Sequence, residues 1–136
     1  MDDVVIYHNP ACGTSRNALQ MIRSAGYEPE VVEYVQTGWD RAELRALLAA
    51  AALTPREALR EKGTPAAELG LLEPGVSDED ILDAMLAHPL LVNRPLVKTP
   101  KGVALARPSE AVLDLLERRP ESFTKEDGEV VRLPPG

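Results

Sequence analysis

A single cysteine, Cys12, is the residue of this chain best suited to covalent chemistry. It follows a short β-branched run and precedes an amphipathic segment, so we expect it in a strand-to-helix loop. The free N–H groups at a helix start favour a thiolate over a thiol. A lone cysteine is more often buried and inert, but polar residues rather than an apolar stripe flank this one. The sequence therefore predicts a reactive thiolate at Cys12.

The residues after Cys12 exclude two familiar thiol chemistries. Ser15 stands where the second cysteine of a C-x-x-C pair would be, so the chain cannot close its own disulfide. A phosphatase-like loop would need an arginine at position 18, which is Ala18. Any reduction that begins at Cys12 therefore requires a second thiol from another molecule.

Composition and charge restrict the class of protein. The chain has 136 residues, 44% hydrophobic and 27% charged, which is typical of one globular domain. Its net charge of −7 argues against binding to nucleic acid or to an anionic membrane. With only His8 and His88 beside Cys12, a structural zinc cage of Cys and His is excluded. No signal peptide or membrane span is apparent, so we expect a cytoplasmic protein.

The elements that position Cys12 begin with a β-α-β unit. The sequence predicts a strand over 4–7, a helix capped by Thr14 or Ser15 and ending near Ala25, and a strand over 31–35. We expect the two strands to be parallel, with a right-handed crossover.

A helical block and a second group of strands follow. Asp40 with Glu43 forms a capping box for one helix, Thr54-Pro55 marks a second helix start, and Ser77 begins a third that ends at His88. The last part has two strands and a helix, and the turn between the strands contains proline and glycine. The predicted strands cover 96–99 and 103–106, the helix starts at Pro108, and 119–136 is a polar, partly disordered tail.

This order of elements predicts the fold class. A β-α-β unit, a helical insertion and a β-β-α unit are the order of an α/β thioredoxin-like fold with a mixed four-stranded sheet. We expect a single domain over 1–118, with the insertion at about 40–87.

The residues around Cys12 also resemble a known family. Residues 7–17 read Tyr-His-Asn-Pro-Ala-Cys-Gly-Thr-Ser-Arg-Asn, similar to the active-site segment of the glutaredoxin-coupled arsenate reductases, which use a single catalytic cysteine. The resemblance extends from residue 4 to about 129. Its further matching segments are 59–60, 89–95, 107–110 and 123–128.

The resemblance implies a role for each matching residue. The family's nucleophile falls on Cys12, the histidine that keeps it ionised on His8, and the substrate-binding arginines on Arg60, Arg94 and Arg107. Guanidinium groups suit a tetrahedral oxyanion because their planar donors pair with its oxygens, although most arginines are simply solvated. By the same resemblance to thioredoxin-like folds, we expect a cis peptide bond between Arg94 and Pro95.

The implied reaction is the reduction of arsenate to arsenite for arsenic detoxification. The resemblance also implies that no cofactor is bound, that glutathione is the co-substrate, and that glutaredoxin is the partner that completes the reaction. One alternative is a regulator of the same fold family that binds RNA polymerase and performs no arsenic chemistry. Another is a thiol-dependent reductase of a different oxyanion or of a glutathione mixed disulfide. The three matching arginines, together with Ser15, favour the arsenate reductase.

Overall fold

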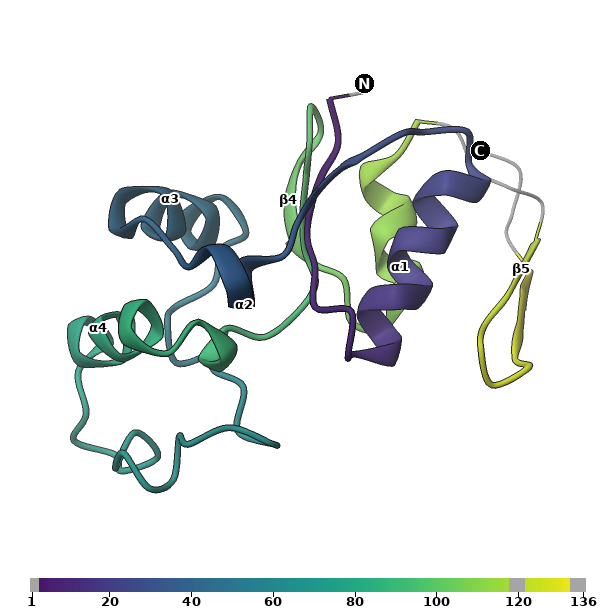
Figure 1. Cartoon of the computed structure of the whole chain (residues 1–136). Coiled ribbons are helices and arrows are strands. Elements are labelled where there is room, and N and C mark those ends of the chain that lie inside the picture. Colours follow the sequence, from purple (N-terminus) through teal and green to yellow (C-terminus); the bar gives the residue numbers. More distant parts are fainter. Residues whose placement is uncertain (1–2, 118–121, 133–136) are drawn as a thin grey trace. The chain divides into compact units, whose positions relative to one another are not determined.

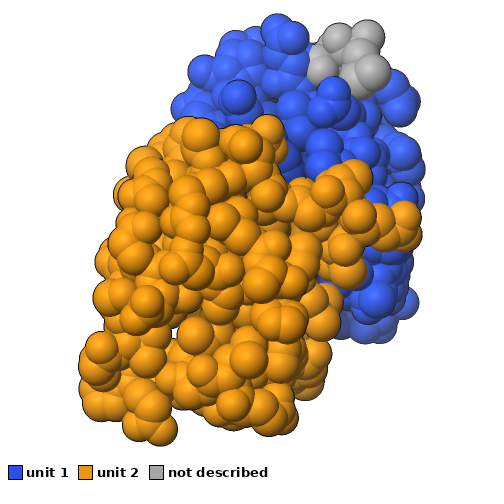
Figure 2. Space-filling view, turned by 60° about the vertical axis from the view of Figure 1, so that its left-hand side comes forward, with its two compact units in different colours: residues 1–33, 94–136 blue, residues 34–93 orange. Residues whose placement is uncertain are grey.

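The computed structural model describes residues 3–117 and 122–132, and its internal contacts define two compact units (Figures 1 and 2). Unit 1 comprises residues 1–33 and 94–136, and unit 2 comprises residues 34–93. The insertion predicted at 40–87 falls within unit 2, which begins earlier and ends later.

The centre of unit 1 is a four-stranded sheet in the order β2-β1-β3-β4. Its strands are β1 (Val5–Tyr7), β2 (Glu30–Val32), β3 (Leu96–Thr99) and β4 (Gly102–Leu105). β1 pairs in parallel with β2, whereas β3 pairs antiparallel with both β1 and β4. The predicted mixed sheet, β-α-β unit and final hairpin are therefore confirmed.

Two helical segments of unit 1 lie side by side on one face of this sheet (Figure 1). They are α1 (Gly13–Ser24) and the 3-10 helix η2 (Ser109–Leu115). Their apolar side chains and those of the sheet form one core, in which Ile6, Met21, Ile22, Val97 and Val112 are completely buried. This core fixes the start of α1 relative to the ends of the strands.

The structure corrects three local predictions in unit 1. The N-cap position of α1 is occupied by Cys12, not by Thr14 or Ser15. The second strand stops at Val32, because the chain turns into a short helix at Tyr34. The helix after Pro108 forms, but with 3-10 geometry.

Unit 2 is built from helices. These are α2 (Tyr34–Thr37), α3 (Arg41–Ala50), α4 (Asp78–Ala87) and the 3-10 helix η1 (Pro89–Leu91). Asp40 caps α3 by accepting from the N–H of Glu43 at 3.0 Å. Ser77 caps α4 by accepting from the N–H of Asp80 at 3.1 Å. Both predicted helix starts are confirmed.

The helix predicted after Thr54 does not form. Its capping box does: the Thr54 hydroxyl accepts from the N–H of Glu57 at 3.2 Å, and the Glu57 carboxylate accepts from the N–H of Thr54 at 2.9 Å. The turn ends because Leu59 pairs with Val92 in an isolated antiparallel bridge. A tertiary contact therefore overrides a correct local signal.

The segment predicted as a tail contains a hairpin. β5 (Ser122–Thr124) and β6 (Val130–Arg132) pair antiparallel. Within the predicted tail, residues 122–132 form this hairpin, and the rest of 119–136 lies outside the described residues. No helix in the described part of the chain is long and apolar enough to cross a membrane.

Candidate active site

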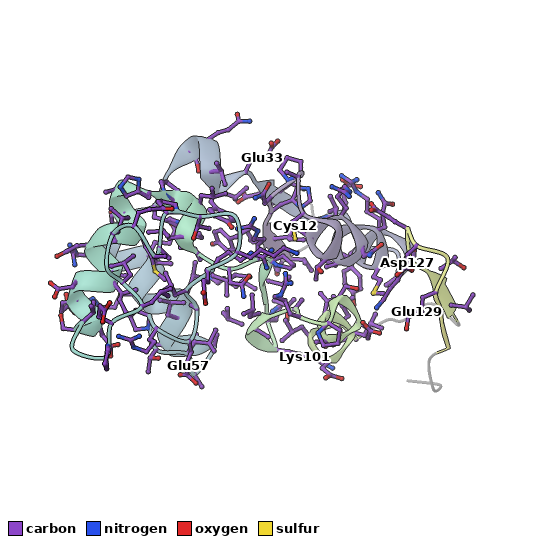
Figure 3. The ribbon with its side chains drawn as sticks, turned by 90° about the horizontal axis from the view of Figure 1, so that it is seen from below. Cys12, Glu33, Glu57, Lys101, Asp127 and Glu129 are labelled. Carbon is purple, nitrogen blue, oxygen red and sulfur yellow. The ribbon has the colours of Figure 1, made fainter. Side chains whose placement is uncertain are left out.

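Cys12 is the residue from which α1 begins. It has extended backbone, with φ −101° and ψ 122°, and its carbonyl accepts the first helical hydrogen bond from the N–H of Arg16 at 3.0 Å. The side chain makes no capping hydrogen bond of ordinary geometry, and the residue is 8% exposed. Figure 3 shows the sulfur at this end of the helix. The first turn of α1 therefore keeps N–H groups that can serve an anion.

The surroundings of the thiol favour its ionised form. Burial opposes ionisation, but the backbone N–H of Ser15 and the guanidinium groups of Arg107 and Arg94 outweigh it and lower the pKa of Cys12. The Arg107 contact is direct, with 3.8 Å between Nη1 and Sγ. The sequence predicted a stabilised thiolate at Cys12, and the lowered pKa is a shift in that direction.

Arg94 and Arg107 come together because of the β3–β4 register. Leu96 pairs with Leu105, so the residues just outside this pair meet at the same end of the hairpin. There the Arg107 guanidinium donates from Nη1 to the carbonyl of Arg94 at 2.8 Å. Arg94 is 8% exposed and Arg107 half-buried. Unit 1 thus brings these predicted substrate ligands to the thiol.

Both arginines precede cis prolines. The peptide bond between Arg94 and Pro95 is cis, as predicted, and so is the bond between Arg107 and Pro108, which the sequence analysis did not anticipate.

His8 lies beside the thiol loop and contacts Ser15. Its Nδ1 lies 2.6 Å from the Ser15 hydroxyl, which also accepts from the N–H of Asn9 at 3.1 Å. All three side chains are buried. Burial lowers the pKa of His8, and the charges of Arg16 and Arg23 act in the same direction against that of Glu33. These surroundings favour the neutral ring, which connects to Cys12 through Ser15.

Arg60 belongs to unit 2. Its N–H donates to the carbonyl of Leu91 at 2.7 Å, next to the Leu59–Val92 bridge, and its Nε donates to the carbonyl of Lys62 at 3.2 Å. The N–H of Asn93 donates back to Ala58 at 2.8 Å. These bonds hold the Arg60 backbone against the segment that leads directly into Arg94.

Sequence reasoning missed part of this site. Ser15 was noted as a candidate helix cap and as the residue that replaces a second cysteine, yet it contacts His8 and supplies an N–H to the Cys12 sulfur. Asn9 was given no role beyond its place in the matching segment 7–17, but its carbonyl accepts from the N–H of Cys12 at 3.0 Å and its Oδ1 from that of Ala11 at 2.9 Å. The available signal was spacing: Asn9 and Ser15 lie three residues on either side of Cys12.

The fold and site define a class. This is a thioredoxin-like protein whose single cysteine lies at the start of the first helix, beside arginine donors that lower the pKa of its thiol. Among the described residues, no group of three or more His, Cys, Asp or Glu side chains is arranged to hold a metal ion.

Comparisons with known proteins give the family. The model of the ArsC family matches residues 7–115. An arsenate reductase of Rhizobium meliloti is 64% identical over 129 residues, covering 94% of this chain and 92% of that protein. The arsenate reductase of Escherichia coli K12 is 49% identical over 132 residues, covering 96% and 94%. The solved structure of an arsenate reductase from Vibrio cholerae superposes with a TM-score of 0.78 at 37% identity, covering 83% of this chain and 97% of that one. The chain belongs to the ArsC family.

Proposed function

We propose that this protein is an arsenate reductase in which the Cys12 thiolate attacks arsenate held by arginines. The observation that carries the proposal is the 3.8 Å contact between Arg107 Nη1 and Cys12 Sγ, which places an oxyanion donor against a thiol whose pKa is lowered. The relatives named above, 49% and 64% identical over nearly the whole chain, are arsenate reductases. The enzyme class is accordingly that of the oxidoreductases.

The first step forms a sulfur–arsenic bond. The thiolate of Cys12 attacks arsenic(V), and one oxygen leaves as water after protonation, so arsenic keeps its oxidation state. Arg94 and Arg107 offset the charge on the remaining oxygens, which is the main contribution a protein makes to such a transfer. The lowered pKa of Cys12 increases the fraction of thiolate, which is the nucleophilic form.

The later steps need two electrons, and these come from two thiols that finish as a disulfide. Cys12 is the only cysteine, and it is released as a thiol at the end of the proposed cycle, so both of these thiols are external. The resemblance assigns them to glutathione, which displaces a second oxygen, and to glutaredoxin, which then attacks the glutathione sulfur. That sulfur–sulfur bond forms as the bond between the glutathione sulfur and arsenic breaks. The electron pair of the broken bond stays on arsenic, which is thereby reduced to arsenic(III). Water finally displaces arsenic(III) from Cys12, and arsenite leaves. Reducing thiols of this kind belong to the cytoplasm, where we place the protein.

His8 acts in this scheme as a neutral residue. Its hydrogen bond with Ser15 orients the segment whose N–H stabilises the thiolate. We therefore propose that His8 positions the Ser15 segment beside the thiolate. In this role it does not form an ion pair with the thiolate.

Arg60 is the third proposed substrate ligand, and it enters the proposal from the family resemblance. Its half-buried side chain and the backbone bonds that hold it are consistent with a fixed role. A guanidinium at this position adds a further charged donor for the oxyanion.

The function is tested by arsenate-dependent NADPH oxidation in the presence of glutathione, glutaredoxin and glutathione reductase. We expect turnover with arsenate and none with phosphate, which has no comparably accessible lower oxidation state. Absence of arsenate turnover, with Cys12 intact and alkylatable, would contradict the proposal. Binding to RNA polymerase under those conditions would then identify the regulator class instead.

A further inference from the structure

The β5–β6 hairpin is joined to the start of α1 by an ion pair that the proposed reaction does not use. Glu126, in the turn of the hairpin, accepts from Arg16 through both carboxylate oxygens: Nε to Oε2 at 2.7 Å and Nη2 to Oε1 at 2.9 Å. The N–H of Glu126 also donates to the Asn17 side chain at 3.1 Å. Asp127 and Glu129 mark this hairpin in Figure 3.

Arg16 makes a further contact, on the loop that carries the nucleophile. Its Nη1 donates to the carbonyl of Pro10 at 2.7 Å. The pair also lies against the residue after Cys12, since a Cβ built on Gly13 would be 3.6 Å from Arg16 Nη2 and 3.7 Å from Glu126 Oε1. One guanidinium therefore spans from the hairpin to the Cys12 loop.

Two contacts attach the hairpin to the rest of unit 1. The Arg16 and Glu126 side chains are 42% and 47% exposed, so their pair contributes only modestly to folding, although its bidentate geometry is favourable. The second attachment is Lys125, whose Nζ lies 2.9 Å from Glu110 of η2. The hairpin is therefore held in part without Arg16, which leaves the bond from Arg16 to the Pro10 carbonyl to be explained.

We propose that Arg16 is a positioning residue for the Cys12 nucleophile, and that Glu126 fixes the plane of its guanidinium so that Nη1 holds the Pro10 carbonyl. On its buried side, the Cys12 loop is held by the bond from the Asn9 N–H to the Ser15 hydroxyl and by the bond from the Cys12 N–H to the Asn9 carbonyl. On its exposed side, it is held by the bond from Arg16 to the Pro10 carbonyl. With Glu126 removed, the guanidinium is free to rotate towards solvent or towards a bound oxyanion. The C-terminal hairpin thus acts on the reaction through one side chain.

The proposal rests on the proposed function, in which Cys12 is the nucleophile, and two readouts separate them. One is kcat and KM for arsenate; the other is the pH profile of Cys12 alkylation by iodoacetamide, which requires no arsenate chemistry. Arg16→Ala and Glu126→Ala are compared with Glu129→Ala, a carboxylate of the same hairpin that is 57% exposed and pairs with Lys125 at 3.2 Å.

We expect Arg16→Ala and Glu126→Ala to lower kcat by about 10-fold with little change in KM, because a small misplacement of a nucleophile has effects of this order. Their alkylation profiles should also shift from that of the parent protein, whereas Glu129→Ala should match the parent in both readouts. Parent-like kcat and alkylation in Glu126→Ala would overturn the proposal. If neither the parent protein nor any variant turns over arsenate, the alkylation profiles still test the positioning role of Arg16.

A charge exchange distinguishes positioning from simple attachment of the hairpin. The double variant Arg16→Glu with Glu126→Arg restores an ion pair, but a carboxylate at position 16 cannot donate to the Pro10 carbonyl. We expect its melting temperature to return to that of the parent while kcat stays low. Recovery of kcat would show that attachment alone is sufficient and would contradict the role of Arg16. Arg16→Lys, whose ammonium can donate to the Pro10 carbonyl but lacks the planar fork that also pairs with Glu126, should recover part of kcat.

Discussion

Helices begin differently in the two units of this protein. In unit 2, Asp40 and Ser77 cap α3 and α4 with side-chain oxygens, which satisfy backbone N–H groups and stabilise the helices. In unit 1, α1 begins at Cys12 with no such bond. The N–H of Ser15 instead favours the thiolate. Unit 2 uses its helix starts for stability, whereas unit 1 gives up an ordinary cap so that its helix start can serve an anion.

The arginines follow the same division. In unit 1, Arg94 and Arg107 contact each other and lower the pKa of Cys12. In unit 2, Arg41 and Arg45 form exposed ion pairs with carboxylates of α4, and Arg60 is held by backbone bonds. The arginines near the thiol should therefore control both its ionisation and substrate binding. Arg60, by contrast, should affect substrate binding alone.

The largest effect is expected for Cys12→Ser. Arsenate reduction should fall by at least about 100-fold, because a serine hydroxyl is not ionised at neutral pH. Serine is a favourable N-cap, so the melting temperature should rise slightly rather than fall. Both are measured on one preparation, by the coupled NADPH assay and by thermal unfolding. Substantial residual turnover would place the nucleophile elsewhere.

Arg107→Lys tests the site in unit 1. Lysine keeps the charge but not the planar donors that reach both the Arg94 carbonyl and the thiol. We expect kcat/KM for arsenate to fall by about 100-fold, the usual effect of removing one preorganised donor.

The pH dependence of the same variant gives the sign of the electrostatic effect. A thiol with a lowered pKa is ionised above that pKa, so alkylation of the parent protein should rise with pH and reach its plateau below the range of an ordinary cysteine. Loss of the Arg107 contact raises the pKa, moving the curve to higher pH. An unchanged curve would show that Arg107 does not stabilise the thiolate.

Arg60→Ala is the corresponding test in unit 2. The loss of one charged donor should raise KM for arsenate by about 10-fold. The alkylation profile of Cys12 should not move, because the groups that lower this pKa belong to unit 1. The matched control is Arg45→Ala, an exposed arginine of the same unit paired with Glu79, which should leave both readouts unchanged. A shifted alkylation profile in Arg60→Ala would contradict the division between the units.

Local signals explain what the sequence could predict. The Asp40 and Ser77 caps lie within three residues of the N–H groups that they accept from, and the β3–β4 hairpin follows from a turn of adjacent residues. That hairpin brings Arg94 and Arg107 together, so their proximity was also within reach. Thr54 shows the limit, since its complete capping box is followed by a bridge to distant Val92 instead of a helix.

Long-range contacts explain what the sequence could not predict. Arg16 and Glu126 are 110 residues apart, and nothing in the pattern around either one indicates its partner. The hairpin that carries Glu126 is polar and short, and was therefore predicted as a tail. The position of Cys12 at the N-cap was not predicted because Thr14 and Ser15, both more favourable N-cap residues, follow it closely in the sequence.

The smallest effect is expected for Ser77→Ala, which tests the stabilising role assigned to the helix starts of unit 2. Loss of the bond from the Asp80 N–H to the Ser77 hydroxyl should cost about 1 kcal/mol. For a domain of this size, that lowers the melting temperature by about 3 °C. Activity and the alkylation profile of Cys12 should remain those of the parent, because this cap serves the helix alone. Cys12→Ser should show the opposite pattern, with activity lost and stability kept. If Ser77→Ala instead lowered kcat without lowering the melting temperature, the division of helix starts between stability and chemistry would be wrong.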